Sequence, residues 1–559
     1  MMLARKGAIL SFALLLASSA QAQDPGTCEP ALAEAELSAG NVRARIFNNG
    51  GLFWRGTPSV YEVPKGGGVM AIFSTTVNIG GLVEGQLRVA GSTYGPHEFW
   101  AGPLNDDGSP PTDCDRYDRI WSISTEDLRA FEASGVPTPD MASWPTGLGA
   151  PTSDGRGTMI DISDLPLSLR AERAIDLAAG ERPVISGDQI LWWIMNDQGN
   201  VHTFTRTVPI GLEVHASAFS FANEGALGNT TFFRMKILKP HGPPLEEAYV
   251  GIQQDSDLGN GQDDYVGSDS ALGLAYTYNA DNDDEGGYGE APPAVGLDFL
   301  RGPLVDSDGR DNNLDGRADE PDERQPMSAF LHYLGGSGVR GDPGLGADFY
   351  TLMQGQWKDG QSVTVGGRGF DFSSEPTSFM HSGMPPAFWS EFDSDGLGTA
   401  LPPFDRRWFA SAGPFTVDAE HPQDILFGIV TSFGADNLDS VRKLKQDDTF
   451  IQNLADEGLL DLRPVASAPP APAQFDLAAS VYPVPAADHV TLRYSLPQEM
   501  AVSIRVFDAL GRAQTIVVQG TRPAGDYSTA IDVSDWRPGA YLARIQMGHV
   551  VASRRILVF

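Results

Sequence analysis

The sequence predicts a mainly β protein that folds in more than one domain. Gly (63 residues) and Pro (40 residues) are frequent in this chain of 559 residues, which favours turns and disfavours a helical bundle. Runs of alternating apolar and polar residues, rich in β-branched and aromatic side chains, recur between these turn residues. Hydrophobic residues make up 41% of the chain, which is enough for a folded core.

The N-terminus has the pattern of a secretory signal peptide over residues 1–22. Arg5 and Lys6 form a basic region, residues 7–17 form an apolar run, and Ala20-Gln21-Ala22 has the form of a cleavage site. The alternative is a buried N-terminal helix. The apolar run is too short for a mature membrane helix, and no later segment is apolar for long enough to be a transmembrane segment.

Residues 23–463 are expected to form a β-sandwich-type body with few helices, either as one unit or as two subdomains. Strand patterns cover residues 42–54, 68–94, 188–197, 211–223 and 230–240. Two helices are predicted. The first spans residues 124–135, with a cap at Ser124 or Thr125 and an end at Gly135. The second spans residues 436–458, and its apolar stripe consists of Leu438, Val441, Leu444, Ile451 and Leu454.

Two cysteines, Cys28 and Cys114, are the whole cysteine complement of the chain. In an oxidising compartment each has one partner available, so a single disulfide between them is expected, with two free thiols as the alternative.

Residues 464–474 consist mainly of Pro, Ala and Ser and predict an extended linker. About seven short strand patterns follow within residues 475–559, separated by turn residues. That number of strands in about 85 residues is typical of an immunoglobulin-like sandwich of seven strands.

This last module resembles the type A C-terminal sorting domain of the bacterial type IX secretion system. The resemblance rests on "YPVPAADHVTLRYSLP", "VFDALGR", "RPGAYLARI" and the final strand with Arg554 and Arg555 before "ILVF". Val484 stands where the family most often has Asn. The resemblance implies that the type IX machinery is a partner and that the protein is exported through the periplasm to the outer cell surface or the medium. The alternative is a FlgD-like immunoglobulin domain that stays attached.

The body resembles large secreted bacterial proteins that carry the same tail, in segments such as "YEVPKGGG", "CDRYDRIW" and "DDYVGSD". That resemblance supports export and implies no particular chemistry.

The formal net charge of −34 argues against nucleic acid or anionic lipid as a partner. The acidity is concentrated: residues 251–323 hold nineteen Asp and Glu residues against three Arg residues, a net charge of −16. Like charges at this density destabilise a compact fold unless a positive group neutralises them.

Residues 311–322 reproduce the spacing of a calcium loop, in which oxygen ligands surround the ion and a glycine at the sixth position permits a sharp turn. Arg317 would contribute its backbone carbonyl, and Asp306 and Asp308 extend the loop towards a second ion. The flanking residues do not read as the paired helices of an EF-hand, so we expect a helix-free structural calcium loop, with a solvated acidic turn as the alternative. The side-chain ligands are Asp311, Asn313, Asp315, Asp319 and Asp322.

A second acidic cluster contains Asp255, Asp257, Asp263 and Asp264. Its spacing fits no loop template, but Asp257 and the Asp263-Asp264 pair are placed to face one cation across a turn. We expect a metal site here, again for Ca²⁺.

Searches for catalytic motifs find no metal-binding histidine pair, no nucleophile elbow and no phosphate-binding loop. The nine histidines are scattered, and tryptophans such as Trp192, Trp389 and Trp408 are expected in the core. The sequence therefore predicts a calcium-stabilised body with a structural, adhesive or ligand-binding role, towards a glycan or protein ligand. The alternative is an extracellular hydrolase acting on polysaccharide or protein, with a site assembled from dispersed residues.

Overall fold

The computed structural model describes residues 26–462, except 57, 96, 162–165, 306–316 and 319–321, and residues 479–559, except 497–499, 508–512 and 548–549. The predicted signal peptide and the predicted linker lie outside the described residues. Strands predominate in the part that is described, which confirms the mainly β fold class. The domain boundaries stay a prediction.

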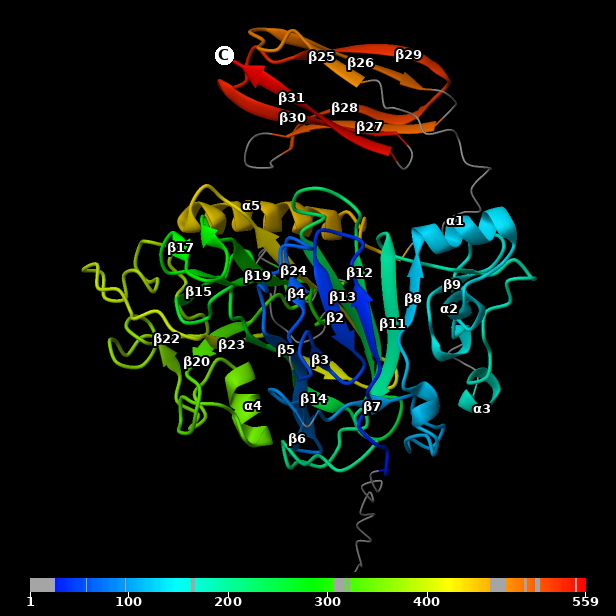
Figure 1. The fold of residues 1–559 in the computed structure, drawn as a ribbon, viewed down its shortest axis with the longest axis vertical. Coiled ribbons are helices and arrows are strands. Elements are labelled where there is room, and N and C mark those ends of the chain that lie inside the picture. The colour runs from blue at the N-terminus through cyan, green and yellow to red at the C-terminus, as the bar shows by residue number, and fades with distance from the viewer. Residues whose placement is uncertain are drawn as a thin grey trace, which may run out of the picture.

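The body is built from two antiparallel sheets of nine strands each, sheet A and sheet B (Figure 1). Sheet A has the main order β1-β2-β3-β5-β14-β23-β20, with β4 beside β2 and β6 beside β5. Its strands are β1 (Glu34–Leu37), β2 (Arg43–Phe47), β3 (Gly51–Leu52), β4 (Tyr61–Glu62), β5 (Ser74–Val83), β6 (Gln86–Ala90), β14 (Leu245–Asp255), β20 (Ala329–Tyr333) and β23 (Arg407–Val417).

Sheet B has the main order β15-β16-β19-β24-β13-β12-β11-β7, with β8 beside β11. Its strands are β7 (Trp100–Ala101), β8 (Trp121–Ser124), β11 (Gln189–Asn196), β12 (Glu213–Ser220), β13 (Thr230–Leu238), β15 (Asp264–Asp269), β16 (Leu274–Asn279), β19 (Ala294–Arg301) and β24 (Gln423–Ser432). Three two-stranded ribbons complete the body: β9 (Thr152–Ser153) with β10 (Arg182–Pro183), β17 (Asp283–Asp284) with β18 (Gly289–Glu290), and β21 (Val363–Thr364) with β22 (Pro376–Thr377).

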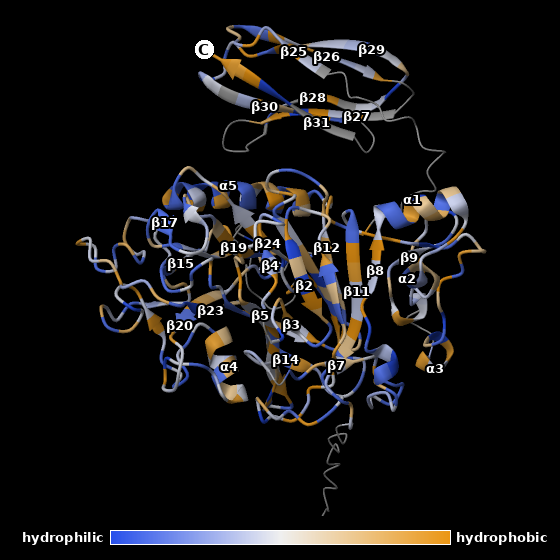
Figure 2. Ribbon diagram, in the orientation of Figure 1, coloured by the Kyte–Doolittle hydropathy of each residue, from blue (hydrophilic) through white to orange (hydrophobic). Residues whose placement is uncertain are grey.

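The two sheets share one hydrophobic core, to which strands of both contribute buried side chains. Figure 2 shows hydrophobic residues, in orange, along the strands of the body. Ile79, Val250 and Ile252 come from sheet A, and Phe233 and Phe427 come from sheet B. The other face of sheet B carries a second core, to which four of the α-helices and many aromatic residues contribute. The tryptophans expected in the core are buried, as predicted: Trp192, Trp193, Trp357, Trp389 and Trp408.

Helices cover the outside of both sheets. α4 lies against β5, β6, β14 and β23 of sheet A, and α5 packs on β16, β19 and β24 of sheet B. Among the described residues, none of the helices is both long and apolar enough to cross a membrane. The α-helices are α1 (Thr125–Ser134), α2 (Pro139–Ala142), α3 (Leu167–Arg170), α4 (Gly346–Met353) and α5 (Asn437–Asp456), and the 3-10 helices are η1 (Asp115–Tyr117) and η2 (Thr146–Leu148).

Both predicted helices form where the capping residues place them. In α1, the Asp127 backbone N–H donates to the Ser124 hydroxyl, and the Asp127 carboxylate accepts from the Ser124 N–H, so the two residues make a capping box. Gly135 ends α1 at φ 71°. Asp436 caps α5 by accepting from the Asp439 N–H at 2.7 Å, and Gly458 follows the helix at φ 64°.

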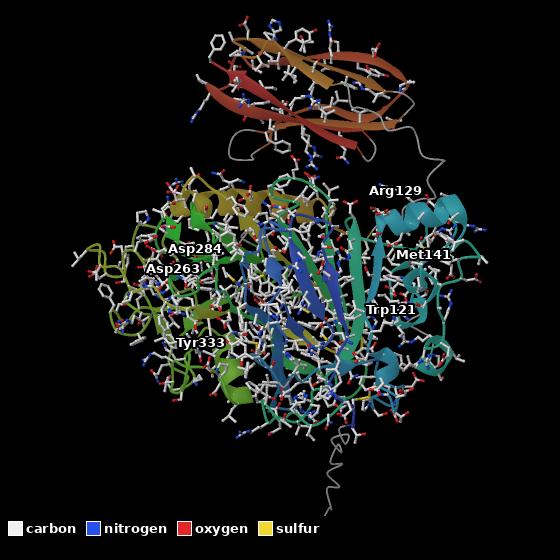
Figure 3. All side chains as sticks on the ribbon, viewed as in Figure 1. Trp121, Arg129, Met141, Asp263, Asp284 and Tyr333 are labelled. Atoms are coloured by element: carbon white, nitrogen blue, oxygen red, sulfur yellow. A yellow bond between two sulfur atoms is a disulfide. The ribbon has the colours of Figure 1, made fainter. Side chains whose placement is uncertain are left out.

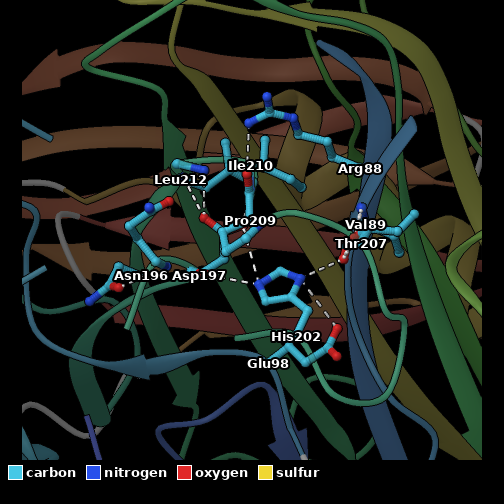
Figure 4. Close-up of polar contacts among 12 residues, drawn as sticks. Arg88, Val89, Glu98, Asn196, Asp197, His202, Thr207, Pro209, Ile210 and Leu212 are labelled. Atoms are coloured by element: carbon cyan, nitrogen blue, oxygen red, sulfur yellow. Dashed lines mark hydrogen bonds and ion pairs between the residues drawn. The ribbon is translucent and has the colours of Figure 1, made fainter. Parts of the chain in front are cut away.

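A buried histidine ties the β11–β12 connection to β6 (Figure 4). His202 Nδ1 lies 2.8 Å from the Val89 carbonyl oxygen, and Nε2 lies 2.8 Å from the Asp197 carbonyl oxygen. The Glu98 carboxylate lies 3.5 Å from Nδ1, so polar groups from three segments of the chain surround the buried ring.

The C-terminal module is a sandwich of two antiparallel sheets with seven strands in total, as the sequence predicted. It has its own hydrophobic core, in which residues such as Leu492, Ile504 and Ile545 are fully buried. One sheet contains β25 (Ala479–Tyr482), β26 (His489–Leu496) and β29 (Gly525–Asp532), and the other contains β28 (Ala513–Arg522), β27 (Met500–Phe507), β30 (Gly539–Met547) and β31 (Val550–Val558).

The structure records a disulfide between Cys28 and Cys114, which are 86 residues apart in the sequence. The bond joins the N-terminal segment to the residue that precedes η1.

Candidate metal centre

The second acidic cluster lies where the chain crosses from sheet A to sheet B. Asp255 is the last residue of β14, Asp264 is the first residue of β15, and residues 256–263 connect the two strands. The structure therefore brings together four of the residues that the sequence singled out as metal ligands, at the junction between the two sheets.

Asp255 is buried, with 2% of its surface exposed, and only one of its carboxylate oxygens has partners. Oδ2 accepts a hydrogen bond from the Tyr94 hydroxyl at 2.6 Å and lies 3.4 Å from Arg407 Nε. Oδ1 is buried and has no hydrogen-bond partner. Burial, followed by the negative charge of Asp257, raises the pKa of Asp255 to about 7.

Asp405, which the sequence analysis did not single out, completes a group of three carboxylates with Asp255 and Asp257. One ligand oxygen from each lies within 4.8 Å of the others. Arg407 Nη2 donates to Asp405 Oδ2 at 2.7 Å, while Asp405 Oδ1 is buried without a partner. Arg407 therefore contacts Oδ2 of both Asp255 and Asp405, and Oδ1 of each residue is left for a metal ion. Burial raises the pKa of Asp257 as well.

Asp264 is fully buried beside this group, with 0% of its surface exposed. Oδ2 accepts from the Leu258 backbone N–H at 3.0 Å, and Oδ1 has no partner. Its pKa is well above the usual value because the carboxylate is desolvated and because Asp257, Asp263 and Asp284 add negative charge nearby. A fully buried carboxylate with an unpartnered oxygen is unstable in its ionised form unless a cation neutralises it.

Asp263 and Asp284 lie side by side at the β15–β17 end of the body (Figure 3). Both Asp263 oxygens are shielded from solvent and have no hydrogen-bond partner. Asp284 is held in place by the backbone N–H groups of Asn260, at 2.9 Å, and Tyr288, at 2.6 Å. A Cβ at Gly259, where φ is 66°, would lie 1.8 Å from Asp284 Oδ2, so a glycine is needed here for the carboxylate to enter.

The donor set at this junction fits a hard divalent cation. Every side-chain donor is a carboxylate oxygen, the ligand type that Ca²⁺ prefers. Unpartnered, shielded oxygens belong to four residues. These four residues are Asp255, Asp263, Asp264 and Asp405. Arg407 forms ion pairs with two of them, Asp255 and Asp405.

The predicted calcium loop falls largely outside the described residues. Asp306, Asp308, Asp311, Asn313, Asp315 and Asp319 are not described, so their role stays a prediction. Arg317 and Asp322 are described; Asp322 is exposed and has a φ of 66°.

A second group of ligand-type side chains consists of His332, His381 and Glu391, all buried. His332 Nδ1 and His381 Nε2 lie 3.2 Å apart, and burial lowers the pKa of His381 to about 4, so its ring is neutral. Glu391 Oε1 accepts from Arg406 Nη2 at 2.7 Å, and Oε2 accepts from the Val266 N–H at 2.6 Å. Because both Glu391 oxygens are occupied, we describe this group as a closed polar network and assign no metal to it.

Sequence reasoning missed this network and the distant members of the metal centre. The two histidines are 49 residues apart, and Asp405 lies about 150 residues beyond Asp255. The pairing of β14 with β23, which sets Asp255 opposite Arg407, brings the Asp405 segment to the site. No local spacing signals that pairing.

Comparison with known protein families identifies the C-terminal module. A family model described as a secretion system C-terminal sorting domain matches residues 480–559. This match favours the sorting domain over a FlgD-like domain. No curated protein matches the chain.

Two solved structures show limited similarity. A polysaccharide lyase is 8% identical, with 62% of this chain and 34% of that chain covered and a TM-score of 0.16. Dimeric latent PorU from Porphyromonas gingivalis is 10% identical, with 66% and 31% covered and a TM-score of 0.13. The chain thus spans about a third of each structure, and similarity at this level carries no argument about the body.

The family match and the seven-stranded sandwich agree over the same residues. Residues 480–559 are therefore a type IX secretion C-terminal sorting domain, which indicates export of the chain to the cell surface or the extracellular space.

Proposed function

We propose that the protein is an exported, calcium-stabilised β-sandwich protein with a structural, adhesive or ligand-binding role. Its Ca²⁺ ion is held at the junction of β14 and β15. The observation that carries the proposal is Asp264, which is fully buried at the junction and has an unpartnered oxygen. Asp255 and Asp405 each present a further unpartnered oxygen at the same junction.

The ion would connect the two sheets. Asp255 ends a strand of sheet A, Asp405 lies two residues before β23 of the same sheet, and Asp264 begins β15 of sheet B. A cation shared by Asp255, Asp257 and Asp405 would cancel their mutual repulsion and fix the start of the crossing between the sheets, with the buried Asp264 beside Asp257. Millimolar extracellular calcium fills even weak sites, with Kd of about 10⁻⁴–10⁻³ M.

Removal of calcium is expected to lower the Tm of the exported chain, residues 23–559. Calcium at 2 mM, about two to twenty times such a Kd, contributes about 0.6–1.8 kcal/mol to the free energy of unfolding. A chelator should therefore lower the Tm by about 1–4 °C. The measurement is a thermal melt in 2 mM CaCl₂ and in EGTA, followed by calcium titration of the chelated chain.

The matched variants are Asp264→Asn, which keeps the shape of the buried side chain, and Glu132→Gln, which changes an exposed acid on α1. Asp264→Asn should lose most of the calcium dependence of the Tm, and Glu132→Gln should keep all of it. A wild-type melt that is identical in calcium and in EGTA would contradict the proposal.

A second candidate function is glycoside hydrolysis, and one observation favours it. The carboxylate oxygens of Asp255, Asp257 and Asp405 lie within 4.8 Å of one another, close to the carboxyl separation of about 5 Å in retaining glycosidases. The Tyr94 ring, whose hydroxyl contacts Asp255, packs against Trp54. Aromatic rings beside paired carboxylates are suited to binding a sugar.

Hydrolysis of a glycan panel by the exported chain tests this second candidate. If Asp255 is the acid or nucleophile, Asp255→Asn should lower kcat at least a hundredfold while Glu132→Gln leaves it unchanged. The absence of turnover on the panel, or equal turnover by Asp255→Asn, would remove the candidate and leave the calcium proposal standing on its thermal melts.

A further inference from the structure

Two buried carboxyl groups face each other between α5 and sheet B. Along α5, Val441, Leu444, Ile451 and Leu454 form the stripe that packs on the sheet, and Asp448 lies within that same buried stripe. On β19, Ala294 and Leu300 point towards α5, and Asp298 lies between them on the same face.

Neither carboxyl group is solvated. Asp448 is 0% exposed and Asp298 is 1% exposed. Both oxygens of Asp448 and Oδ2 of Asp298 are buried without a hydrogen-bond partner. α5 packs on β19, and a Cβ at Gly296, on the same face of the strand as Asp298, would touch Leu444 of the helix. Burial, followed by the negative charge of Asp448, raises the pKa of Asp298.

The cations around the pair are already paired with other groups. On α5, Lys443 binds Asp447 at 2.6 Å, and Lys445 binds Asp269 of β15 at 2.9 Å. At the end of β19, Arg301 binds Asp461 at 2.7 Å.

The remaining charged groups that face the pair are negative. Asp447 and Asp269 act on Asp448, and Asp456 acts on Asp298. No cation in the described part of the chain forms an ion pair with Asp298 or Asp448. If Asp298 and Asp448 were ionised, no positive group in the described part of the chain would neutralise their negative charge.

A proton is the simplest group that removes this charge. Two ionised carboxylates cannot both persist in an apolar interface, because each loses its hydration and each repels the other. A bound metal ion is a poorer solution, since two carboxylates supply fewer oxygens than the six to eight that Ca²⁺ takes.

We propose that Asp298 and Asp448 form a protonated latch that holds α5 on sheet B and that releases the helix when the pair ionises. α5 is the last helix of the body, and the predicted linker to the sorting domain begins eight residues after it ends. The latch therefore controls the segment of the body from which the tail departs.

The direction of the pH effect follows from the burial of the pair. Burial raises the pKa of both aspartates above its usual value, so the folded state binds these protons more tightly than the unfolded state does. The stabilisation is complete below the usual pKa of about 4 and is lost as the pH rises through the pKa of the folded state. The docking of α5 should weaken towards alkaline pH.

Hydrogen exchange of the exported chain between pH 5 and pH 9, in saturating calcium, tests the latch. After correction for intrinsic exchange, the α5 amides of the wild type should exchange at least ten times faster at pH 9 than at pH 5. The double variant Asp298→Asn/Asp448→Asn carries neutral groups of the same shape and should show no such change. Arg442→Met, an exposed substitution on the same helix that does not act on the pair, should behave as the wild type.

Two results would overturn the proposal. One is equal pH dependence of α5 exchange in the wild type and in the double variant. The other is a wild-type Tm at pH 8 that rises with Na⁺, K⁺ or Ca²⁺ and loses that rise in Asp448→Asn, which would make the pair a cation site. If the double variant does not fold, the single variant Asp448→Asn provides the same comparison. Asp264→Asn, which alters the calcium centre, should leave the α5 profile unchanged, so failure of the latch and failure of the calcium proposal are distinguishable.

Discussion

Replacement of Arg406 by Met is expected to lower the free energy of unfolding of the body by about 3–5 kcal/mol. The Arg406 and Glu391 side chains are 4% and 0% exposed, and Arg406 makes two contacts with Glu391 Oε1, at 2.7 and 3.0 Å. Loss of the guanidinium leaves a buried carboxylate beside His332 and His381 with only the Val266 N–H to stabilise it. Denaturant unfolding, followed by tryptophan fluorescence, measures the change.

An exposed ion pair provides the matched control for Arg406. Arg442 Nη2 contacts Asp439 at 3.0 Å with side chains that are 52% and 37% exposed, so Arg442→Met should cost less than about 1 kcal/mol. The double variant Arg406→Met/Glu391→Met should regain part of the loss, because no buried charge remains. Equal effects of Arg406→Met and Arg442→Met would show that the Arg406 pair is not desolvated in solution.

Removal of the disulfide is expected to lower the free energy of unfolding by about 4–5 kcal/mol. The bond joins Cys28 to Cys114 across 86 residues, and closing a loop of that length removes a large conformational entropy from the unfolded chain. Calorimetry of the exported chain with and without reductant measures the effect as a fall in the Tm of the body.

The variant Cys28→Ser/Cys114→Ser is an internal control, because these are the two cysteines of the chain. It should melt like the reduced wild type, and reductant should not change it further. If reductant leaves the wild-type Tm unchanged, the bond does not contribute to the stability of the body. The C-terminal module has its own core, so its transition should be unaffected.

Local patterns were sufficient for the secondary structure of several elements. α1 begins at the predicted cap Ser124, and α5 begins after Asp436, the first residue of the predicted range; in both, the cap side chain accepts from a backbone N–H of the first turn. The apolar stripe of α5 forms as predicted, and the structure shows that it packs on sheet B. Asp448 shows the limit of the pattern, since its polar side chain occupies a buried position that periodicity alone would assign to an apolar residue.

The sequence alone determined the mainly β fold class, the seven-stranded tail with its sorting-domain character, and the acidic residues Asp255, Asp257, Asp263 and Asp264 as one local cluster. These features depend on residue type and on spacings of a few residues. The tertiary structure decided that Asp405 and Arg407 join the cluster, that His332 meets His381 and Glu391, and that Asp298 faces Asp448. Each of these contacts joins segments far apart in the chain. Burial of hydrophobic surface drives the pairing of the sheets and the packing of α5. The polar side chains on the same strands and helix are thereby brought into contact.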